Sequence, residues 1–376
     1  MKPSSQRHPR RVRGLSLVEL MVALTIGSLL IVGAITVYSN SRTTFAVNEQ
    51  VARLQDQGRY VMSVLEPDIE LAGYYGFTNS PDTLRYVDGA APGVVLATAP
   101  QLRQRPIADP AVDPVPAPGL AASAQACGVN FAVDVLSPVQ GSNGAFELGP
   151  DATADCGPFG AGALDGADTL AVRRASAAPA AAAEAGRLQI FASRLRSRTA
   201  QLMFDDGVAP AAVDADNVIH DLLVRAFYVS QDSVDRPGTP ALRVKSLTRV
   251  GGNPAFLDTE VMPGVEDFQV QFGIDTGDYD NDGNIDANAD LNNDGIPESD
   301  GRATRYVNAD FPDLDRVQVV SVRVWVRLRA EQPDFGYVDD RVYRYADVEY
   351  TPVGAERQFR RLLLTRTIAL RNARTL

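Results

Sequence analysis

The sequence predicts an α+β fold, in which one long N-terminal helix packs on an antiparallel β-sheet. Two observations lead to this prediction. An apolar stretch near the N-terminus passes directly into a segment with helical spacing, and the remaining chain holds several short runs of β-branched and aromatic residues. The 376 residues, 45% hydrophobic and 22% charged, are enough to bury a sizeable core and have the composition of a globular protein.

The charge of the chain is divided unevenly. Residues 1–14 contain five basic residues and no acid, so 31 of the 36 lysines and arginines remain to balance all 47 acidic residues in the rest of the chain. A body with this excess of acid repels phosphate backbones. We therefore do not expect nucleic-acid binding over its general surface.

The first helical segment is expected to span a membrane. Residues 15–38 are apolar apart from one charged residue, Glu19, and a helix of this length, about 36 Å, crosses a bilayer. The arginines before it favour a cytoplasmic N-terminus and an exported body. Gly14, a small residue of the kind found at cleavage sites, precedes the apolar run instead of following it. Cleavage there removes residues 1–14 and leaves the helix on the mature protein.

Residues 39–75 are expected to continue this helix with one apolar face that packs on the sheet. Apolar residues or glycine recur at spacings of three and four, at Val47, Val51, Leu54, Gly58, Val61 and Leu65. Pro67 predicts that the helix kinks or ends near Glu66.

Residues 76–376 are expected to form a β-rich exported domain. Six runs predict strands, at residues 169–173, 222–229, 242–247, 265–272, 316–328 and 342–350. Within the fifth run, residues 322–329 alternate, which predicts a half-buried strand with arginines on one face and Trp325 on the buried apolar face. The segments 89–126 and 175–187, rich in alanine and proline, are expected to be surface loops.

The chain has two cysteines, Cys127 and Cys156. In an exported domain they are expected to form one disulfide, which would stabilise the fold by about 3 kcal/mol through the loop that it closes. The alternative is a pair of free buried thiols, as in a cytosolic protein, because the sequence does not reveal whether the two lie close enough to be joined.

The acidic segment 275–301 predicts a calcium site. It holds nine acids and no base, and two stretches twelve residues apart place oxygen side chains at the first, third and fifth positions before a glycine, an arrangement that wraps a hard cation. The candidate ligands are Asp278, Asp280, Asp282, Asp286, Asp290, Asn292, Asp294 and Glu298. Ala289 and Gly301 occupy the twelfth positions, so the bidentate acid of an EF-hand is missing. The alternative is a solvated acidic insertion without a metal.

Residues suited to catalysis are scarce. His8 lies in the basic leader, which leaves His220 as the one histidine of the cleaved chain, and no nucleophile signature accompanies it. A histidine-rich zinc site is excluded because the cleaved chain has a single histidine. We expect His220 to lie at the surface or at a sheet edge, and we expect no enzyme activity.

The sequence GLSLVEL at positions 14–20 resembles the processing site of type IV prepilins and type II secretion pseudopilins. The resemblance implies that a prepilin peptidase cuts after Gly14 and that Leu15, where the family usually has phenylalanine, becomes the methylated N-terminus. It also implies that residues 15–38 enter a filament core and that Glu19 meets the N-terminal amine of a neighbouring subunit. From the residues alone, Glu19 is either a costly acid in an apolar span or an acid near the interface that is stabilised by the helix macrodipole.

Four further segments resemble, in this order, the PilW family of large minor pilins: IELAGYYGF at 69–77, GADTLAVRR at 166–174, GVEDFQVQFGID at 264–275 and ALRN at 369–372. The resemblance implies a pilin-like fold and a non-enzymatic minor pilin that primes or caps a type IV pilus and supports pilus biogenesis, adhesion, twitching motility or DNA uptake. The implied partners are other minor pilins, the major pilin, a tip-associated adhesin, the prepilin peptidase and the inner-membrane assembly platform. The chain is then a single-pass inner-membrane protein with a periplasmic body before assembly, and part of a cell-surface pilus afterwards.

Two alternatives stay open. A large pseudopilin of a type II secretion system shares the helix and the processing site, and neighbouring secretion genes would favour it. A membrane-tethered, calcium-dependent exported enzyme belongs to a different class. Such an enzyme keeps its activity as a soluble fragment without residues 1–40, whereas a filament subunit loses function with Glu19→Ala.

Overall fold

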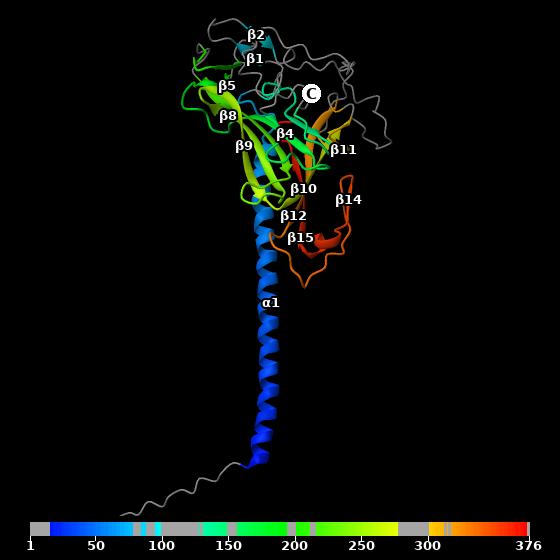
Figure 1. Ribbon diagram of the computed structural model, residues 1–376. Coiled ribbons are helices and arrows are strands. Elements are labelled where there is room, and N and C mark those ends of the chain that lie inside the picture. The colour runs from blue at the N-terminus through cyan, green and yellow to red at the C-terminus, as the bar shows by residue number, and fades with distance from the viewer. Residues whose placement is uncertain are drawn as a thin grey trace, which may run out of the picture. The chain divides into compact units, whose positions relative to one another are not determined.

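The computed structural model divides the chain into two compact units, residues 1–53 and residues 54–376. One helix, α1 (Leu17–Glu70), contributes to both units and has 54 residues (Figure 1). The structure describes residues 16–77, 84–87, 95–98, 127, 131–148, 156–193, 201–210, 216–276, 301–311, 314 and 317–373.

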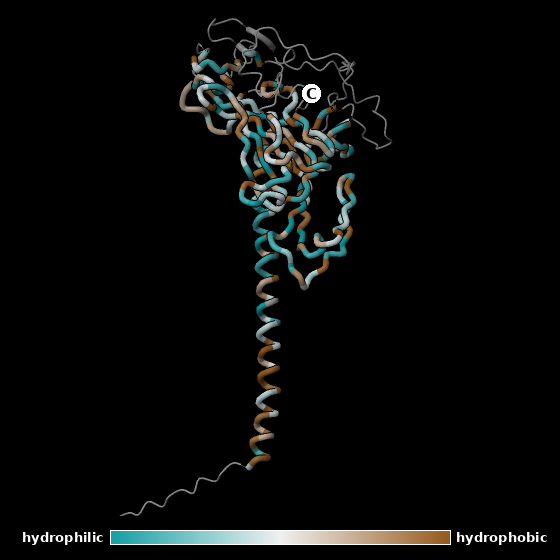
Figure 2. The backbone as a smooth tube through the Cα atoms, in the orientation of Figure 1, coloured by the Kyte–Doolittle hydropathy of each residue, from teal (hydrophilic) through white to brown (hydrophobic). Residues whose placement is uncertain are grey.

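The described part of the first unit, residues 16–53, is the first part of α1, and it is apolar as far as Tyr38. Its large hydrophobic side chains between Leu17 and Tyr38 are exposed, and the stretch has the length and composition of a helix that can cross a membrane. Figure 2 shows hydrophobic residues concentrated in this part of α1 and hydrophilic residues in the part that follows. Within the described part of the first unit no other segment covers this surface, so a bilayer or other protein chains must cover it in the cell.

The second unit begins with the amphipathic part of α1. Leu54, Val61 and Leu65 of the predicted stripe are buried, which confirms the stripe for this part of the helix. A Cβ atom added to Gly58 would lie 2.2 Å from Leu364 Cδ1, so glycine lets the helix approach the sheet closely. Val51 is 38% exposed, so burial starts later along the helix than the spacing predicts.

The end of α1 differs from the sequence prediction. The helix passes through Pro67 and ends at Glu70, beyond the predicted stop at Glu66 and short of the predicted limit at residue 75. A proline three residues before the end removes one backbone hydrogen bond. Tertiary contacts outweigh this loss, because Asp68 and Ile69 in the last turn are both buried in the second unit.

A nine-stranded sheet forms the larger layer of the second unit. Its strands follow the order β2-β1-β6-β5-β7-β4-β3, and β8 pairs with both β7 and β9. The β1–β6 pair is parallel and the other pairs are antiparallel, so the sheet is mixed, not purely antiparallel as predicted. The bounds are β1 Arg85–Val87, β2 Val95–Thr98, β3 Val139–Ser142, β4 Thr169–Ala175, β5 Ala185–Ala192, β6 Leu202–Asp206, β7 Val218–Ser230, β8 Ala241–Val250 and β9 Asn253–Pro263.

A four-stranded antiparallel sheet forms the second layer, in the order β11-β10-β12-β15. Its strands are β10 (Val265–Asp275), β11 (Arg305–Asn308), β12 (Gln318–Arg329) and β15 (Arg361–Ala369). Between β12 and β15 the chain forms the hairpin β13 (Tyr343–Tyr345) and β14 (Val348–Tyr350), followed by the short 3-10 helix η4 (Gly354–Gln358). Figure 1 shows β12 and β15 beside the upper part of α1.

The main core lies between the two sheets and the second part of α1. It joins apolar residues of α1 such as Leu65, of the nine-stranded sheet such as Phe227, and of the four-stranded sheet such as Phe268 and Val326. A second core covers the other face of the nine-stranded sheet and includes both cysteines. The helix on a sheet that the sequence predicts is therefore confirmed for the second unit.

The six predicted runs all overlap strands, namely β4, β7, β8, β10, β12 and the β13–β14 hairpin. The last run was predicted as one strand, but Ala346 adopts a left-handed φ of 47° and turns the chain between β13 and β14. The prediction of surface loop is wrong for residues 95–98, which form β2, and for residues 185–187, which begin β5. The strands outside the six runs are not predicted, because they are short or show no clear alternation in sequence; they are β1, β2, β3, β5, β6, β9, β11 and β15.

The prediction for Trp325 is wrong about its face. In β12 it shares a face with Arg323 and Arg327, while Val324 and Val326 point into the main core. This second face is buried too, because Trp325 packs against the β13–β14 hairpin. The strand is therefore covered on both faces and is not half-buried as predicted.

Candidate assembly site

The N-terminus of α1 is closed by a reciprocal pair of hydrogen bonds. Ser16 precedes the first helical residue, and its Oγ accepts a hydrogen bond from the Glu19 N–H at 3.1 Å. In return, Glu19 Oε2 accepts hydrogen bonds from the Ser16 N–H at 3.1 Å and the Ser16 hydroxyl at 3.2 Å. This is a capping box, which satisfies backbone donors that have no partner within the helix. The neighbouring Gly14 and Leu15 lie outside the described residues.

The capping box gives Glu19 a partner within its own chain. Its side chain is exposed and has no basic partner among the described residues. The acid therefore uses one oxygen to stabilise its own helix and remains accessible to a cation supplied by another molecule. Both open interpretations of Glu19 are compatible with this geometry, because a cap does not prevent a later ion pair.

A buried acid near the other end of α1 fixes the helix to the nine-stranded sheet. Asp68 Oδ1 accepts hydrogen bonds from Arg174 Nη2 at 2.7 Å and Nε at 3.0 Å, and Asp68 Oδ2 accepts one from Arg225 Nη1 at 2.7 Å. The side chain of Asp68 is 2% exposed. Because a charge at this depth is tolerated only when it is paired, the three residues fix the position of the last turn of α1.

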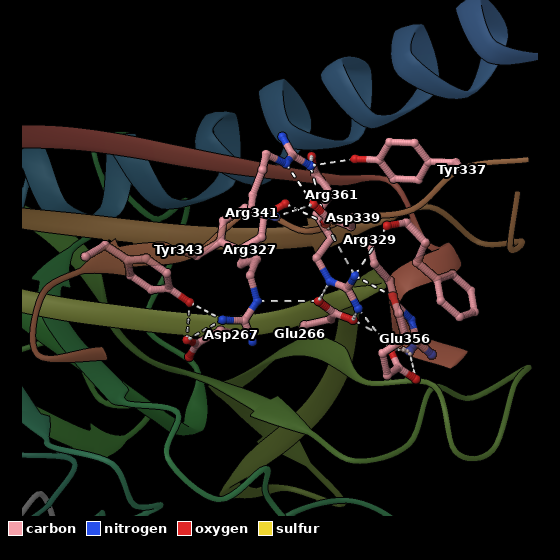
Figure 3. A network of polar contacts seen from close by, with 12 residues as sticks. Glu266, Asp267, Arg327, Arg329, Tyr337, Asp339, Arg341, Tyr343, Glu356 and Arg361 are labelled. Carbon is pink, nitrogen blue, oxygen red and sulfur yellow. Dashed lines mark hydrogen bonds and ion pairs between the residues drawn. The ribbon is translucent and has the colours of Figure 1, made fainter. Parts of the chain in front are cut away.

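The outer face of the four-stranded sheet carries a buried network of acids and arginines (Figure 3). At its centre, the two carboxylate oxygens of Glu266 accept hydrogen bonds from Arg361 Nε at 2.7 Å and Nη2 at 3.0 Å. The Arg361 side chain is fully buried. Burial lowers the pKa of Arg361, but Glu266 outweighs burial and holds that pKa above its ordinary value. The bidentate geometry fixes both side chains and joins the start of β15 to the start of β10.

The network continues along β12. Arg327 places Nε 3.4 Å from Glu266 Oε2 and Nη1 3.5 Å from Asp267 Oδ2, and it donates a hydrogen bond to the Tyr345 hydroxyl. Its guanidinium lies 3.7 Å from the centre of the Tyr350 ring. These contacts connect β12 with both strands of the β13–β14 hairpin, so charge pairing and cation–π contact together hold the hairpin on the sheet.

A second acid closes the network at the far side of Arg361. Asp339 accepts hydrogen bonds from Arg341 Nε and the Tyr343 hydroxyl, both at 2.8 Å, and lies 3.6 Å from Arg361 Nη1. Burial alone would raise the pKa of Asp339, but the bonds from Arg341 and Tyr343 hold it below its ordinary value. Asp339 is therefore a stable anion that anchors the segment before β13.

The network has balanced charge. Four acids, Glu266, Asp267, Asp339 and Glu356, face four arginines, Arg327, Arg329, Arg341 and Arg361. Among the described residues, none of its contacts involves a serine, cysteine or histidine that acts as a nucleophile or base. The arrangement supports a structural role, in which the segment 330–360 is fixed over the outer face of the sheet.

A further buried acid connects the two sheets. Asp168, in the turn before β4, accepts backbone hydrogen bonds from Gly144 at 2.8 Å and from Val270 of β10 at 2.7 Å. Burial raises the pKa of Asp168, the two backbone bonds oppose that rise in part, and the result is a pKa of about 7. The acid in the GADTLAVRR segment therefore has a structural role, because it accepts these two backbone hydrogen bonds.

The structure joins Cys127 and Cys156 in a disulfide whose Cα atoms are 5.2 Å apart. His220 does not lie where the sequence predicts. It is 3% exposed on β7, where Ile190 of β5 is its strand partner, and its Nδ1 lies 2.8 Å from the Ser176 carbonyl oxygen. The prediction of a surface or edge position is therefore wrong, because β7 is a central strand that is covered by the segment around Tyr74.

The predicted calcium ligands, Asp278 to Glu298, lie outside the described residues. The base of their loop is described. Residues 277–300 leave β10 and return to β11, and Ile274 pairs with Arg305 at the base. Asp275 accepts a hydrogen bond from the Gly301 N–H at 3.0 Å, and the hydroxyl oxygens of Thr276 and Thr304 are 2.9 Å apart. The two ends of the acidic segment are therefore held together.

Comparisons with known proteins agree with the N-terminal motif and with the second unit. Residues 9–35 match the family model described as Prokaryotic N-terminal methylation motif, and residues 226–372 match the one described as Type IV Pilus-assembly protein W. A solved type IV-like pilin from Thermus thermophilus aligns with 50% of this chain and 85% of its own, at 13% identity and a TM-score of 0.21. A score this low carries no weight for the fold. No match is found among the curated proteins.

The apolar N-terminal helix and its match to the methylation motif together fit a membrane-anchored pilin. More specifically, residues 226–372 are similar to the PilW family, and this match together with the N-terminal motif supports a PilW-type pilin. The PilW match runs from the second half of β7 to the residues after β15, and it contains the whole buried network of Figure 3.

Sequence reasoning missed the buried network. The signal available was the pair Glu266-Asp267, two adjacent acids at the start of a predicted strand, together with arginines at alternate positions of β12. Their partners were not visible, because Arg361 lies 95 residues from Glu266 in the sequence.

Proposed function

We propose that this protein is a minor pilin, a non-enzymatic subunit that primes or caps a type IV pilus. The observation that carries the proposal is the apolar stretch of the first unit: residues 17–38 are an exposed helix with the methylation motif and a single acid, Glu19, at its start. A passive membrane anchor has no need of an acid there, because a carboxylate in an apolar span costs free energy. The large second unit suits a cap better than a repeating shaft subunit.

In this account the protein is held in the inner membrane with its body in the periplasm, and assembly moves it into a pilus at the cell surface. Glu19 exchanges partners during that step. In the free subunit its carboxylate accepts hydrogen bonds from Ser16, and in the filament it would pair with the N-terminal amine of a neighbouring subunit. Pairing with a cation lowers the cost of burying the acid among packed helices.

The partners in this account are other minor pilins, the major pilin and a tip-associated adhesin, with the prepilin peptidase and the assembly platform acting before incorporation. The PilW match supports partners within a pilus system. A large pseudopilin of a type II secretion system has the same N-terminal features, and the PilW match favours the pilus.

The test is a deletion strain that is complemented with the wild-type gene, Glu19→Ala or Glu49→Ala, and scored for surface pili. Glu49 is an exposed acid of α1 that pairs only with Arg53 among the described residues, so its variant is a matched control. We expect few pili in the deletion strain and with Glu19→Ala, and normal pili with wild type and Glu49→Ala. Normal piliation in the deletion strain contradicts a priming role.

We also propose that the acidic loop binds Ca²⁺ as a structural ion outside the cell. The alternating acids and glycines support this, as does the closed base of the loop, which keeps the two ends of the loop together. Calcium is expected to raise the melting temperature of the full-length protein and EDTA to reverse the rise, whereas Asp280→Asn with Asp282→Asn abolishes the response. A melting temperature that is the same with Ca²⁺ and with EDTA contradicts the proposal.

A further inference from the structure

The edge strand β15 has an open side. It lies at the end of the four-stranded sheet, and among the described residues its strand partner is β12 alone. The pairing runs from Arg361 to Ala369 without a register shift. An antiparallel strand at the edge of a sheet directs half of its backbone groups away from the sheet.

The residues that direct their backbone groups outward follow from the hydrogen bonds at the two ends of β15. The Leu370 N–H donates to the Val320 carbonyl oxygen, and the Ala330 N–H donates to the Arg360 carbonyl oxygen. Because backbone groups alternate in direction along a strand, the even-numbered residues from 360 to 370 bond to β12. The odd-numbered residues therefore point their N–H and C=O groups outward, namely Leu363, Thr365, Thr367 and Ala369. The outward carbonyl of Arg361 agrees with this direction, because it accepts a hydrogen bond from Arg341 Nη2 at 3.3 Å.

This edge lacks the features that usually prevent strands from pairing. Leu363 is partly buried, Thr365, Thr367 and Ala369 are exposed, and the strand has no proline and no bulge. Its one central charge, Arg366, is paired with Glu66 of α1 at 2.7 Å on the helix side of the sheet. A long, regular edge whose central charge is paired on the helix side of the sheet is a template for another extended chain.

The edge is also held rigidly before any partner arrives. Arg361 fixes the start of β15 to Glu266, and the Arg371 N–H donates to the Glu70 carbonyl just beyond its end. Because both ends are fixed, little conformational entropy is lost when a strand is added.

The direction of β15 restricts which strand can bind. Gly58 of α1 contacts Leu364, Glu66 pairs with Arg366 and Glu70 pairs with Arg371, so β15 runs parallel to the second part of α1. Antiparallel pairing of β15 with β15 of a second copy would set these two helix segments in opposite directions. Neighbours whose helix segments run in the same direction therefore cannot pair in this way.

The opposite edge of the same sheet has the required direction. β11 is antiparallel to β10, β10 to β12, and β12 to β15, so β11 runs antiparallel to β15. A neighbour with a similar sheet and the same helix direction therefore offers an antiparallel strand at the right edge. We propose that the open edge of β15 binds an edge strand of a neighbouring pilin-class subunit, antiparallel to β15, and so continues the sheet from one subunit into the next. This proposal rests on the proposed function.

Amide hydrogen exchange resolved to single residues tests the proposal on the full-length protein, free in detergent and within purified pili. In the free protein the outward amides of Leu363, Thr365, Thr367 and Ala369 are expected to exchange fast, and those of Leu364 and Arg366 slowly. Assembly is expected to slow the outward amides selectively. Thr365→Pro removes an outward N–H without breaking the β12 ladder, and it is expected to lower incorporation into pili about tenfold, the effect of losing one or two backbone hydrogen bonds. Thr365→Ala is the matched control and is expected to assemble normally.

The remaining outcomes overturn one claim or the other. If the protein is present in pili and its outward amides exchange as fast as in the free protein, strand addition is refuted and the proposed function stays intact. Protection of the same amides in the free protein that grows with its concentration indicates that free copies of this chain pair with each other, and it refutes an occupant that is met only in the pilus. A protein that is absent from pili whose assembly does not need it refutes the proposed function, and strand addition with it. The exchange experiment needs no variant, so a misfolded Thr365→Pro protein does not remove the test.

Discussion

Asp68 and Arg174 form an ion pair in which Asp68 Oδ1 accepts two hydrogen bonds, from Arg174 Nη2 at 2.7 Å and from Arg174 Nε at 3.0 Å, and both side chains are almost fully buried. This pair fixes the last turn of α1 to β4. Asp68→Asn leaves two arginines without their counter-ion, and we expect it to lower the free energy of unfolding by about 3 kcal/mol. Chemical unfolding of the full-length protein in detergent measures the loss.

The exposed pair Glu49–Arg53 provides the control for this prediction. Its side chains are 71% and 57% exposed, so Glu49→Gln is expected to change the free energy of unfolding by less than about 0.5 kcal/mol. Equal stability of Asp68→Asn and wild type would show that the buried pair does not anchor the helix.

The contact between α1 and β15 depends on the absence of a side chain at Gly58. A Cβ there would lie 2.2 Å from Leu364 Cδ1 and 3.6 Å from Leu362 Cδ2. Gly58→Leu is therefore expected to destabilise the second unit by about 1–3 kcal/mol through overpacking. Adding Leu364→Ala should restore part of the loss, because it vacates the space. Gly33→Leu, in the exposed part of α1, has nothing within 4 Å and should leave the unfolding of the second unit unchanged.

The pH dependence of stability is expected to report on Asp168. Its pKa is about 7 in the folded protein and ordinarily 3.8, so the folded state holds a proton that the unfolded state loses between these values. Below about pH 4 the protonated Asp168 makes its full contribution to the free energy of unfolding. This contribution, about 2–4 kcal/mol, is lost as the pH rises to about 7. The free energy of unfolding of the wild type minus that of Asp168→Asn should therefore fall as the pH rises. A difference that is flat or rises across this range would contradict the assignment.

Reduction of the disulfide is expected to destabilise the second unit. Cys127 and Cys156 are 29 residues apart, and a loop of that size corresponds to about 3 kcal/mol. The measurement compares thermal unfolding of wild type with and without a reducing agent. The double variant Cys127→Ser, Cys156→Ser serves as control, because the reducing agent should not affect it. An unchanged unfolding temperature in reduced wild type would refute a stabilising role.

Local patterns predicted the parts of the fold that depend on local periodicity. The stripe from Leu54 to Leu65 identified the buried face of α1 because a helix repeats its faces every three to four residues. The β-branched runs identified β4, β7, β10 and β12 for the corresponding reason in strands. Glu19 was singled out because one acid in an apolar stretch is conspicuous, and its position at the helix start follows from the same stretch.

Contacts between distant segments could not be predicted in the same way. Alternation along β12 separates Trp325 from Val324 and Val326, but it does not reveal that the β13–β14 hairpin covers the second face. Pro67 predicts a helix stop, but the buried pair of Asp68 and Arg174 keeps the last turn helical. His220 is buried because β7 lies in the middle of a sheet, which depends on strand order and not on the residues beside it.

The central claim is that the protein reaches its mature form by losing its basic leader and keeping its apolar helix. Intact-mass and N-terminal peptide analysis of the protein purified from its native membrane tests this claim most directly. We expect a chain that begins at Leu15 with one added methyl group and that contains Glu19. A chain that still carries residues 1–14, or one that begins after Tyr38, would contradict the claim.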